Sequence, residues 1–185
     1  QTAVPPLSFE SIGNPYASAI DFLLLTKTGS IDDKFYVWDP LLTNNANGYG
    51  GYQCLSATNS WKPGPGGTAN HDDNTAYTTI QSGQAFFVFS SGSGGTVSFT
   101  ESAKVNGSLA ANRPGDLNGN RQFFRLNMYN ANNILTDGNI IAFDPEFSNE
   151  YDAADAIKLT NTSENIGIKK ATNILSVEAR KPVMA

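Results

Sequence analysis

His71 is the chain's only histidine, and an imidazole is the most common general base in enzymes. It stands in the polar run 70–74, next to Asp72 and Asp73, where a solvated loop tip is expected. The sequence has no Gly-x-Ser-x-Gly turn to hold a nucleophilic serine near it. A glycosidase needs two facing carboxylates, and no spacing among the six glutamates and eleven aspartates singles out a pair. The sequence therefore predicts a protein that is not an enzyme, with no catalytic residues.

Acidic residues are concentrated in residues 144–155, where five acids occur without a basic residue among them: Asp144, Glu146, Glu150, Asp152 and Asp155. Carboxylate oxygens gathered in a loop are typical ligands of Ca²⁺, so a structural calcium ion is one interpretation. The alternatives are pairing with Arg121 or Arg125, or solvation at the N-terminus of a short helical turn, where negative side chains are favoured. The sequence leaves these three alternatives open.

Aromatic residues in loops indicate a second kind of site, because the apolar faces of sugars stack on such rings. The candidates for glycan binding are Trp61, in a long Gly/Pro-rich loop over residues 60–77, together with Tyr49 and Tyr52. Loops of this length in compact domains are usually functional or mobile. Trp38 precedes an Asp-Pro pair at the end of an apolar strand, and we expect it in the core.

The composition limits the classes of partner. A net charge of -5 and a pI near 4.7 argue against nucleic acid, which requires a basic face. Cys54 is the single cysteine, which excludes an internal disulfide and indicates a buried thiol. No apolar run approaches the roughly 18–20 residues of a membrane span, so direct insertion into a membrane is not expected. Low charge with many small polar and aromatic residues favours a secreted or cell-surface protein built of short strands.

The elements that would position these residues are short strands separated by Gly/Asn-rich turns. Residues 122–129 show the clearest alternation, with Phe124 and Leu126 on one face and Arg125 on the other. Residues 90–95 predict a Gly/Ser hairpin turn, with a return strand at 96–100. Ser18 could cap one or two helical turns that run into the next strand. The other predicted strands span residues 7–12, 34–38, 49–56, 85–89, 139–143, 156–159, 166–169 and 174–178.

This pattern predicts an all-β fold, a two-sheet and mainly antiparallel β-sandwich of jelly-roll-like type with one or two short helical turns. Residues 1–7 are expected to be an extended lead-in and residues 8–180 a single domain. Residues 181–185 are expected to form a tail or linker.

Six short motifs occur in order along nearly the whole chain. They are Ile-Gly-Asn-Pro-Tyr-x-Ser-Ala-Ile-Asp (12–21), Tyr-x-Trp-Asp-Pro (36–40), Gly-Gln-Ala-Phe-Phe-Val (83–88), Thr-Val-x-Phe-Thr (96–100), Phe-Arg-Leu (124–126) and Tyr-Asp-Ala-x-Asp-Ala-x-Lys-Leu (151–159). In this combination the chain resembles a domain of large secreted and cell-surface proteins of Bacteroidetes exported by the type IX secretion system. In those proteins the domain typically precedes a C-terminal sorting domain.

The resemblance implies a surface or adhesin-like role and supplies no catalytic or binding residues. We therefore expect a non-catalytic extracellular structural or adhesive module of a bacterial surface protein. Its partners would be other copies of itself or neighbouring modules of a longer surface protein. The alternative is a carbohydrate-binding module, whose aromatic loop residues would stack on sugars.

Overall fold

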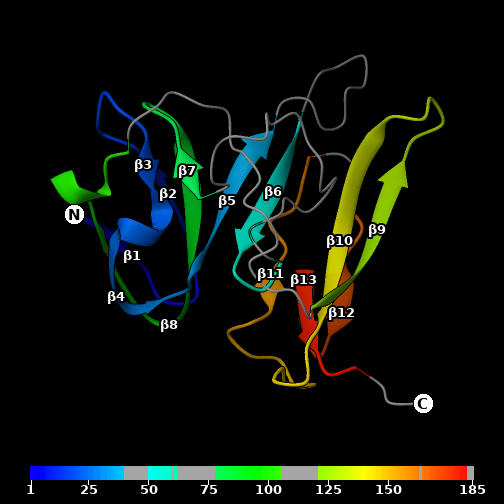
Figure 1. Ribbon diagram of the computed structural model, residues 1–185. Coiled ribbons are helices and arrows are strands. Elements are labelled where there is room, and N and C mark those ends of the chain that lie inside the picture. Colours follow the sequence, from blue (N-terminus) through cyan, green and yellow to red (C-terminus); the bar gives the residue numbers. More distant parts are fainter. Residues whose placement is uncertain (40–49, 60, 62–77, 106–120, 163, 183–185) are drawn as a thin grey trace. The chain divides into compact units, whose positions relative to one another are not determined.

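The computed structural model describes residues 1–39, 50–59, 61, 78–105, 121–162 and 164–182. These residues form strands and two short 3-10 turns, and they contain no α-helix (Figure 1). The expected fold class, all-β and sandwich-like with mainly antiparallel sheets, is confirmed. The chain divides into two compact units, residues 1–37 with 70–115 and residues 38–69 with 116–185. The assignment of residues 8–180 to a single domain stays a prediction.

The first unit is built around one long strand. Its elements are β1 (Thr2–Val4), β2 (Phe9–Gly13), β3 (Ile20–Asp21), η1 (Phe22–Leu24), β4 (Thr26–Ile31), the first part of β5 (Lys34–Asp39), β7 (Thr79–Ile80), β8 (Ala85–Ser98) and η2 (Glu101–Ala103). The expected lead-in over residues 1–7 therefore contains a strand, because β1 pairs with the second half of β8. β3 and β7 form a separate two-stranded ladder.

Strand β8 pairs with four other strands. Its first half pairs with β2 and, at Phe87, with β5, while its second half pairs with β1 and β4. The prediction of a hairpin turn at residues 90–95 was wrong, because one strand runs through this segment without reversing. The glycines of this segment allow the backbones of neighbouring strands to come close together. A Cβ on Gly95 would collide with the carbonyl oxygen of Thr28, and a Cβ on Gly94 would lie 2.8 Å from the carbonyl oxygen of Val4.

Asn14 organises the motif at residues 12–21. Its Nδ2 donates to the carbonyl oxygens of Ser18 at 2.9 Å and Gln81 at 3.0 Å, and its Oδ1 accepts from the backbone N–H of Tyr16. The buried side chain thus binds three backbone groups and joins the segment 14–18 to Gln81. The helical turn expected here is the short η1, but its cap is Asp21, whose carboxylate accepts from the N–H of Leu23, and not Ser18.

Aromatic side chains fill the core of the first unit. The ring centroids of Phe22 and Phe35 lie 4.6 Å apart, and both rings meet Phe86 edge-on at about 6 Å. All three residues are fully buried. The apolar sequence at 20–25 and the strand at 85–89 therefore contribute to the same core.

The second unit contains β6 (Gly51–Ser56), β9 (Gln122–Tyr129), β10 (Leu135–Phe143), β11 (Ala156–Ile157), β12 (Ile168–Lys170) and β13 (Asn173–Arg180). Five of these strands form a sheet in the order β11-β13-β10-β9, with β12 also paired to β13. Among the described strands of this sheet, only the β10–β13 pair is parallel. β10 and β13 bury apolar residues, among them Ile140, Ala142, Leu175, Val177 and Ala179.

β9 covers the eight residues predicted for it, and a tight turn links it to β10. In that turn the Asn130 carboxamide accepts from the N–H groups of Asn132 and Ile134. The helical turn expected within residues 144–155 is absent. Instead, isolated turns occur there. They are closed by hydrogen bonds from the backbone N–H of Phe147 to the carbonyl oxygen of Asp144 and from the backbone N–H of Asp155 to the carbonyl oxygen of Asp152.

Candidate functional site

The structure separates the five acids of residues 144–155. Asp144 pairs with Arg121, and Asp155 is buried against Lys170. Asp152 accepts from the backbone N–H of Ala154, while Glu146 and Glu150 are exposed. Among the described residues no three acidic, histidine or cysteine side chains gather as a metal site would require. For Asp144, pairing with Arg121 is the one of the three alternatives that the geometry supports.

The Asp144 carboxylate is held by two charge-stabilising contacts. The backbone N–H of Glu146 donates to its Oδ1 at 3.0 Å, and Arg121 Nε donates to its Oδ2 at 2.9 Å. These hydrogen bonds, the backbone one first, lower the pKa of Asp144 below the ordinary 3.8. Arg121 also donates to the carbonyl oxygen of Ala57 and lies over the ring of Phe147.

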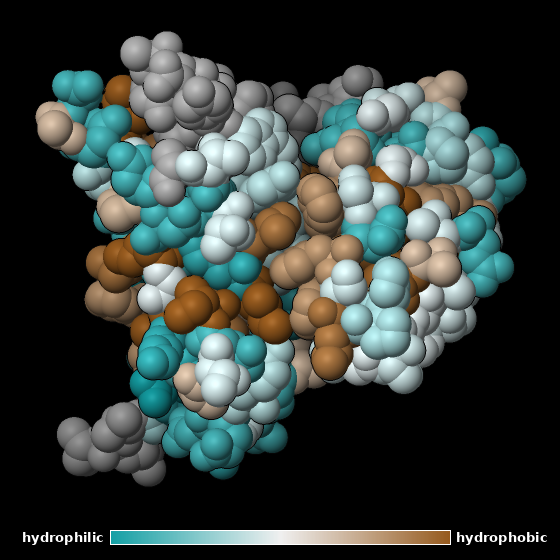
Figure 2. Space-filling view, turned by 180° about the vertical axis from the view of Figure 1, so that it is seen from behind, coloured by the Kyte–Doolittle hydropathy of each residue, from teal (hydrophilic) through white to brown (hydrophobic). Residues whose placement is uncertain are grey.

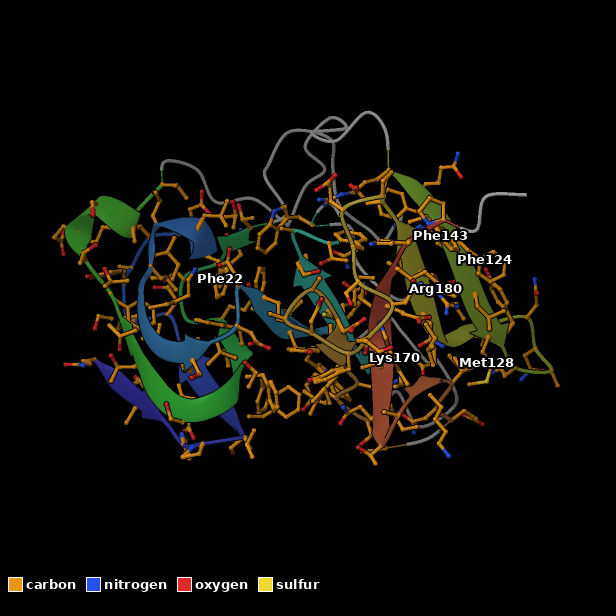
Figure 3. The ribbon with its side chains drawn as sticks, turned by 90° about the horizontal axis from the view of Figure 1, so that it is seen from below. Phe22, Phe124, Met128, Phe143, Lys170 and Arg180 are labelled. Carbon is orange, nitrogen blue, oxygen red and sulfur yellow. The ribbon has the colours of Figure 1, made fainter. Side chains whose placement is uncertain are left out.

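Asp155 and Lys170 form a buried polar cluster in the second unit. Lys170 Nζ lies 3.1 Å from both carboxylate oxygens of Asp155, and it also donates to the carbonyl oxygen of Ala179. Glu178 Oε1 is 3.9 Å from the same nitrogen, and its own side chain is only 6% exposed. The ribbon view with side chains marks Lys170 beside strand β13 (Figure 3). Two carboxylates and one amine therefore share a largely buried site.

A second buried ion pair joins Lys158 to Asp137. Lys158 Nζ lies 2.7 Å from Asp137 Oδ2, and the aspartate side chain has no exposed surface. Asp137 also accepts from the backbone N–H of Ile166. The sequence analysis did not identify Lys158 or Lys170 as buried residues. The one pattern that could have indicated Lys158 is the motif at 151–159, in which Asp155 and Lys158 are three positions apart within a largely apolar stretch.

The solvent exposure of the two tryptophans is the reverse of what the sequence predicted. Trp61 is only 7% exposed, so it is buried and does not present its ring to solvent as a loop residue would. Its backbone N–H donates to the carbonyl oxygen of Ser56 at 2.8 Å. Trp38, expected in the core, is 39% exposed. The ring of Trp38 meets that of Tyr52 edge-on, with centroids 4.8 Å apart. Tyr49 and His71 lie outside the described residues.

Strand β9 presents apolar side chains to solvent. Phe124 is 54% exposed and Leu126 44%, while the residues that alternate with them are half-buried. Figure 3 labels Phe124 and Met128 along this strand, and Figure 2 shows one face of the molecule where apolar side chains reach the surface. Exposed apolar residues that share one side of a strand indicate a contact surface more than isolated ones do.

Fold and contacts thus describe an all-β, sandwich-like protein with buried ion pairs and with apolar side chains exposed on strand β9. Residues 3–182 match the model of a domain of unknown function, DUF8693, and the chain belongs to this family. No match was found among curated proteins or among solved structures. None of the described helical segments has the length and apolar character of a membrane-spanning helix.

Proposed function

We propose that the chain is a non-catalytic structural or adhesive module that works outside the cell or on its surface. The observation that carries this proposal is the exposed apolar side of β9, formed by Phe124 and Leu126. Keeping such residues in water is unfavourable, and their burial against a partner would contribute about 25 cal/mol per Å². The proposed partners are other copies of the chain or neighbouring modules of a longer surface protein.

The small size of this surface determines the strength of the contact. Stable complexes bury about 800 Å² on each partner, and two half-exposed side chains supply far less. A single contact is therefore weak, and it becomes effective when many copies are held side by side, because linked contacts add avidity. Weak but repeated contacts suit a structural array.

The placement outside the cell rests on the sequence. The chain carries few charged residues and resembles, in six ordered motifs, domains of secreted and surface proteins of Bacteroidetes. The buried Asn14 and the buried Asp155 and Lys158 show that two of these motifs serve the fold.

Sedimentation velocity over a range of protein concentrations tests the proposal. We expect reversible self-association of the wild type, weakened in the double variant F124S/L126S. The matched control is L23S/L24S, which removes two leucines of similar exposure, 46% and 50%, from η1. A wild type that stays monomeric at the highest concentration, or a loss of association in both variants, would refute β9 as the contact surface.

Carbohydrate binding is the second candidate, and the exposed Trp38 favours it. Its ring and that of Tyr52 stand almost perpendicular, at 73°, and form an apolar corner on which a sugar ring could stack. A glycan array probed with the purified chain tests this candidate. Binding should disappear in Trp38→Ala and persist in Tyr129→Ala, which removes another exposed aromatic ring. Binding that survives Trp38→Ala would exclude this pair as the site.

A further inference from the structure

We propose that Lys170 and Asp155 become joined by an intramolecular amide bond, formed by the folded chain itself between Lys170 Nζ and Asp155 Cγ. The structure shows the two side chains as an ion pair, the arrangement from which the bond would form. The proposal assigns a covalent modification to the cluster of Lys170, Asp155 and Glu178, and it is independent of the proposed contact surface on β9.

The amine lies against the carboxyl group that it would attack. Lys170 Nζ is 3.1 Å from both Oδ1 and Oδ2 of Asp155, so it contacts the two oxygens that flank Cγ. Nζ is held there by its bond to the carbonyl oxygen of Ala179. Reactive groups kept at about 3–3.5 Å in a fixed orientation react as if at very high concentration.

Two backbone N–H groups also bind the Asp155 carboxyl group. The N–H of Ala179 donates to Oδ1 at 2.9 Å, and the N–H of Asp152 donates to Oδ2 at 3.0 Å. Attack on Cγ moves negative charge onto an oxygen. Preorganised N–H donors stabilise such a charge, most strongly where water is excluded. Asp155 has no exposed side-chain surface, which meets that condition.

Glu178 supplies the proton transfers. Its Oε1 lies 3.9 Å from Lys170 Nζ, and Arg180 Nε lies 3.7 Å from the same oxygen. A carboxylate beside the amine can accept a proton from the attacking nitrogen and return it to the departing oxygen. The Lys158–Asp137 pair is as close and as buried, yet its described contacts include no second carboxylate.

The reaction is a balanced condensation. Lys170 and Asp155 first exchange a proton and become a neutral amine and a carboxylic acid. The Nζ–Cγ bond forms, the bond from Cγ to the hydroxyl oxygen breaks, and Glu178 carries a proton from nitrogen to that hydroxyl, which leaves as water. No oxidant, reductant or other reactant is needed. The neutral amide replaces two charges whose burial is costly, which favours the product.

Intact mass spectrometry of the purified, then denatured chain tests the bond. We expect the wild type to weigh one water molecule less than its sequence, and a proteolytic digest to contain a peptide that joins the segments around Asp155 and Lys170. Lys170→Arg keeps the positive charge and should restore the full sequence mass. The matched control Lys158→Arg, made in the other buried pair, should retain the loss of water.

Glu178→Gln provides a second test that leaves both reacting residues in place. Its circular dichroism spectrum should match that of the wild type, while bond formation is slowed or abolished. A folded wild type that keeps its full sequence mass after prolonged incubation would overturn the proposal. A loss of water that persists in Lys170→Arg, or that maps to other residues, would overturn it as well.

Discussion

Arg121 and Asp144 are 23 positions apart in the sequence, yet Nε of the arginine donates to Oδ2 of the aspartate at 2.9 Å. The same guanidinium reaches the carbonyl oxygen of Ala57 through Nη1. Arg121 therefore joins the residues before β9 to the turn after β6 and to the segment after β10. This single side chain links three parts of the second unit.

The lowered pKa of Asp144 predicts an acid-sensitive contribution to stability. Because the folded-state pKa lies below the unfolded value, the contribution is fully present above the unfolded pKa, near pH 4, and is lost as the pH falls through the folded pKa. Asp144→Asn should lower the free energy of unfolding at pH 7, and the difference from the wild type should shrink towards pH 2. Urea titrations at several pH values measure this.

The exposed pair of Glu101 and Lys104 provides the control for that experiment. The Glu101 side chain is 78% exposed, and exposed ion pairs contribute little. Glu101→Gln should therefore leave the free energy of unfolding nearly unchanged at every pH. An equal loss in both variants would show that general charge, and not the Arg121 contact, accounts for the effect.

The buried pair of Lys158 and Asp137 predicts a large effect when one partner is removed. Lys158→Met leaves the fully buried Asp137 carboxylate without its cation, which should cost about 3–5 kcal/mol. The double variant K158M/D137L removes both charges and should recover much of the loss. Chemical denaturation measures all three proteins, and a single variant as stable as the wild type would contradict the prediction.

The close packing at Gly95 predicts a loss of stability when a side chain is added there, in the first unit. A Cβ there collides with the Thr28 carbonyl oxygen of the neighbouring strand, so Gly95→Ala should destabilise by about 3 kcal/mol, at the upper end for overpacking. Gly13→Ala is the control, because a Cβ on Gly13 meets nothing within 4 Å. Thermal unfolding followed by circular dichroism should separate the two variants, and similar melting temperatures would argue against the close approach.

Calcium should not change the stability of this chain. Asp144 and Asp155 already have cationic partners in Arg121 and Lys170. An ion bound only to the folded state would add about 2.7 kcal/mol at a hundredfold excess over its dissociation constant, a shift of several degrees. We expect melting curves in excess calcium and in chelator to coincide. A higher melting temperature with calcium would instead place an ion site in the protein.

The sequence predicted the fold class and the strongest strands because those depend on local pattern. The alternation in residues 122–129 gave the bounds of β9, since a period of two requires no knowledge of distant residues. The glycines at 92, 94 and 95 led to the wrong prediction of a hairpin turn, because glycines that permit a turn also permit close approach between strands. Only the position of the carbonyl of Thr28 decides between the two.

The candidate sites were less predictable, because burial depends on tertiary packing. Trp38 lies on a strand and Trp61 in a loop region, yet the strand residue is exposed and the loop residue is buried. Lys158 and Lys170 resemble surface lysines in sequence, and only their distant partners, Asp137 and Asp155, account for their burial. Charge pairing between distant segments leaves no periodic signal.

The two halves of β8 pair with different strands, and this restricts how the length of β8 can vary. Neighbouring residues of a strand face opposite sides, so removing one residue between Phe89 and Gly95 would invert the side chains of one half of β8 relative to those of the other half. Removing two residues would preserve the facing but shift the register. Over evolutionary time this segment should therefore accept exchanges among small residues far more readily than insertions or deletions of odd length.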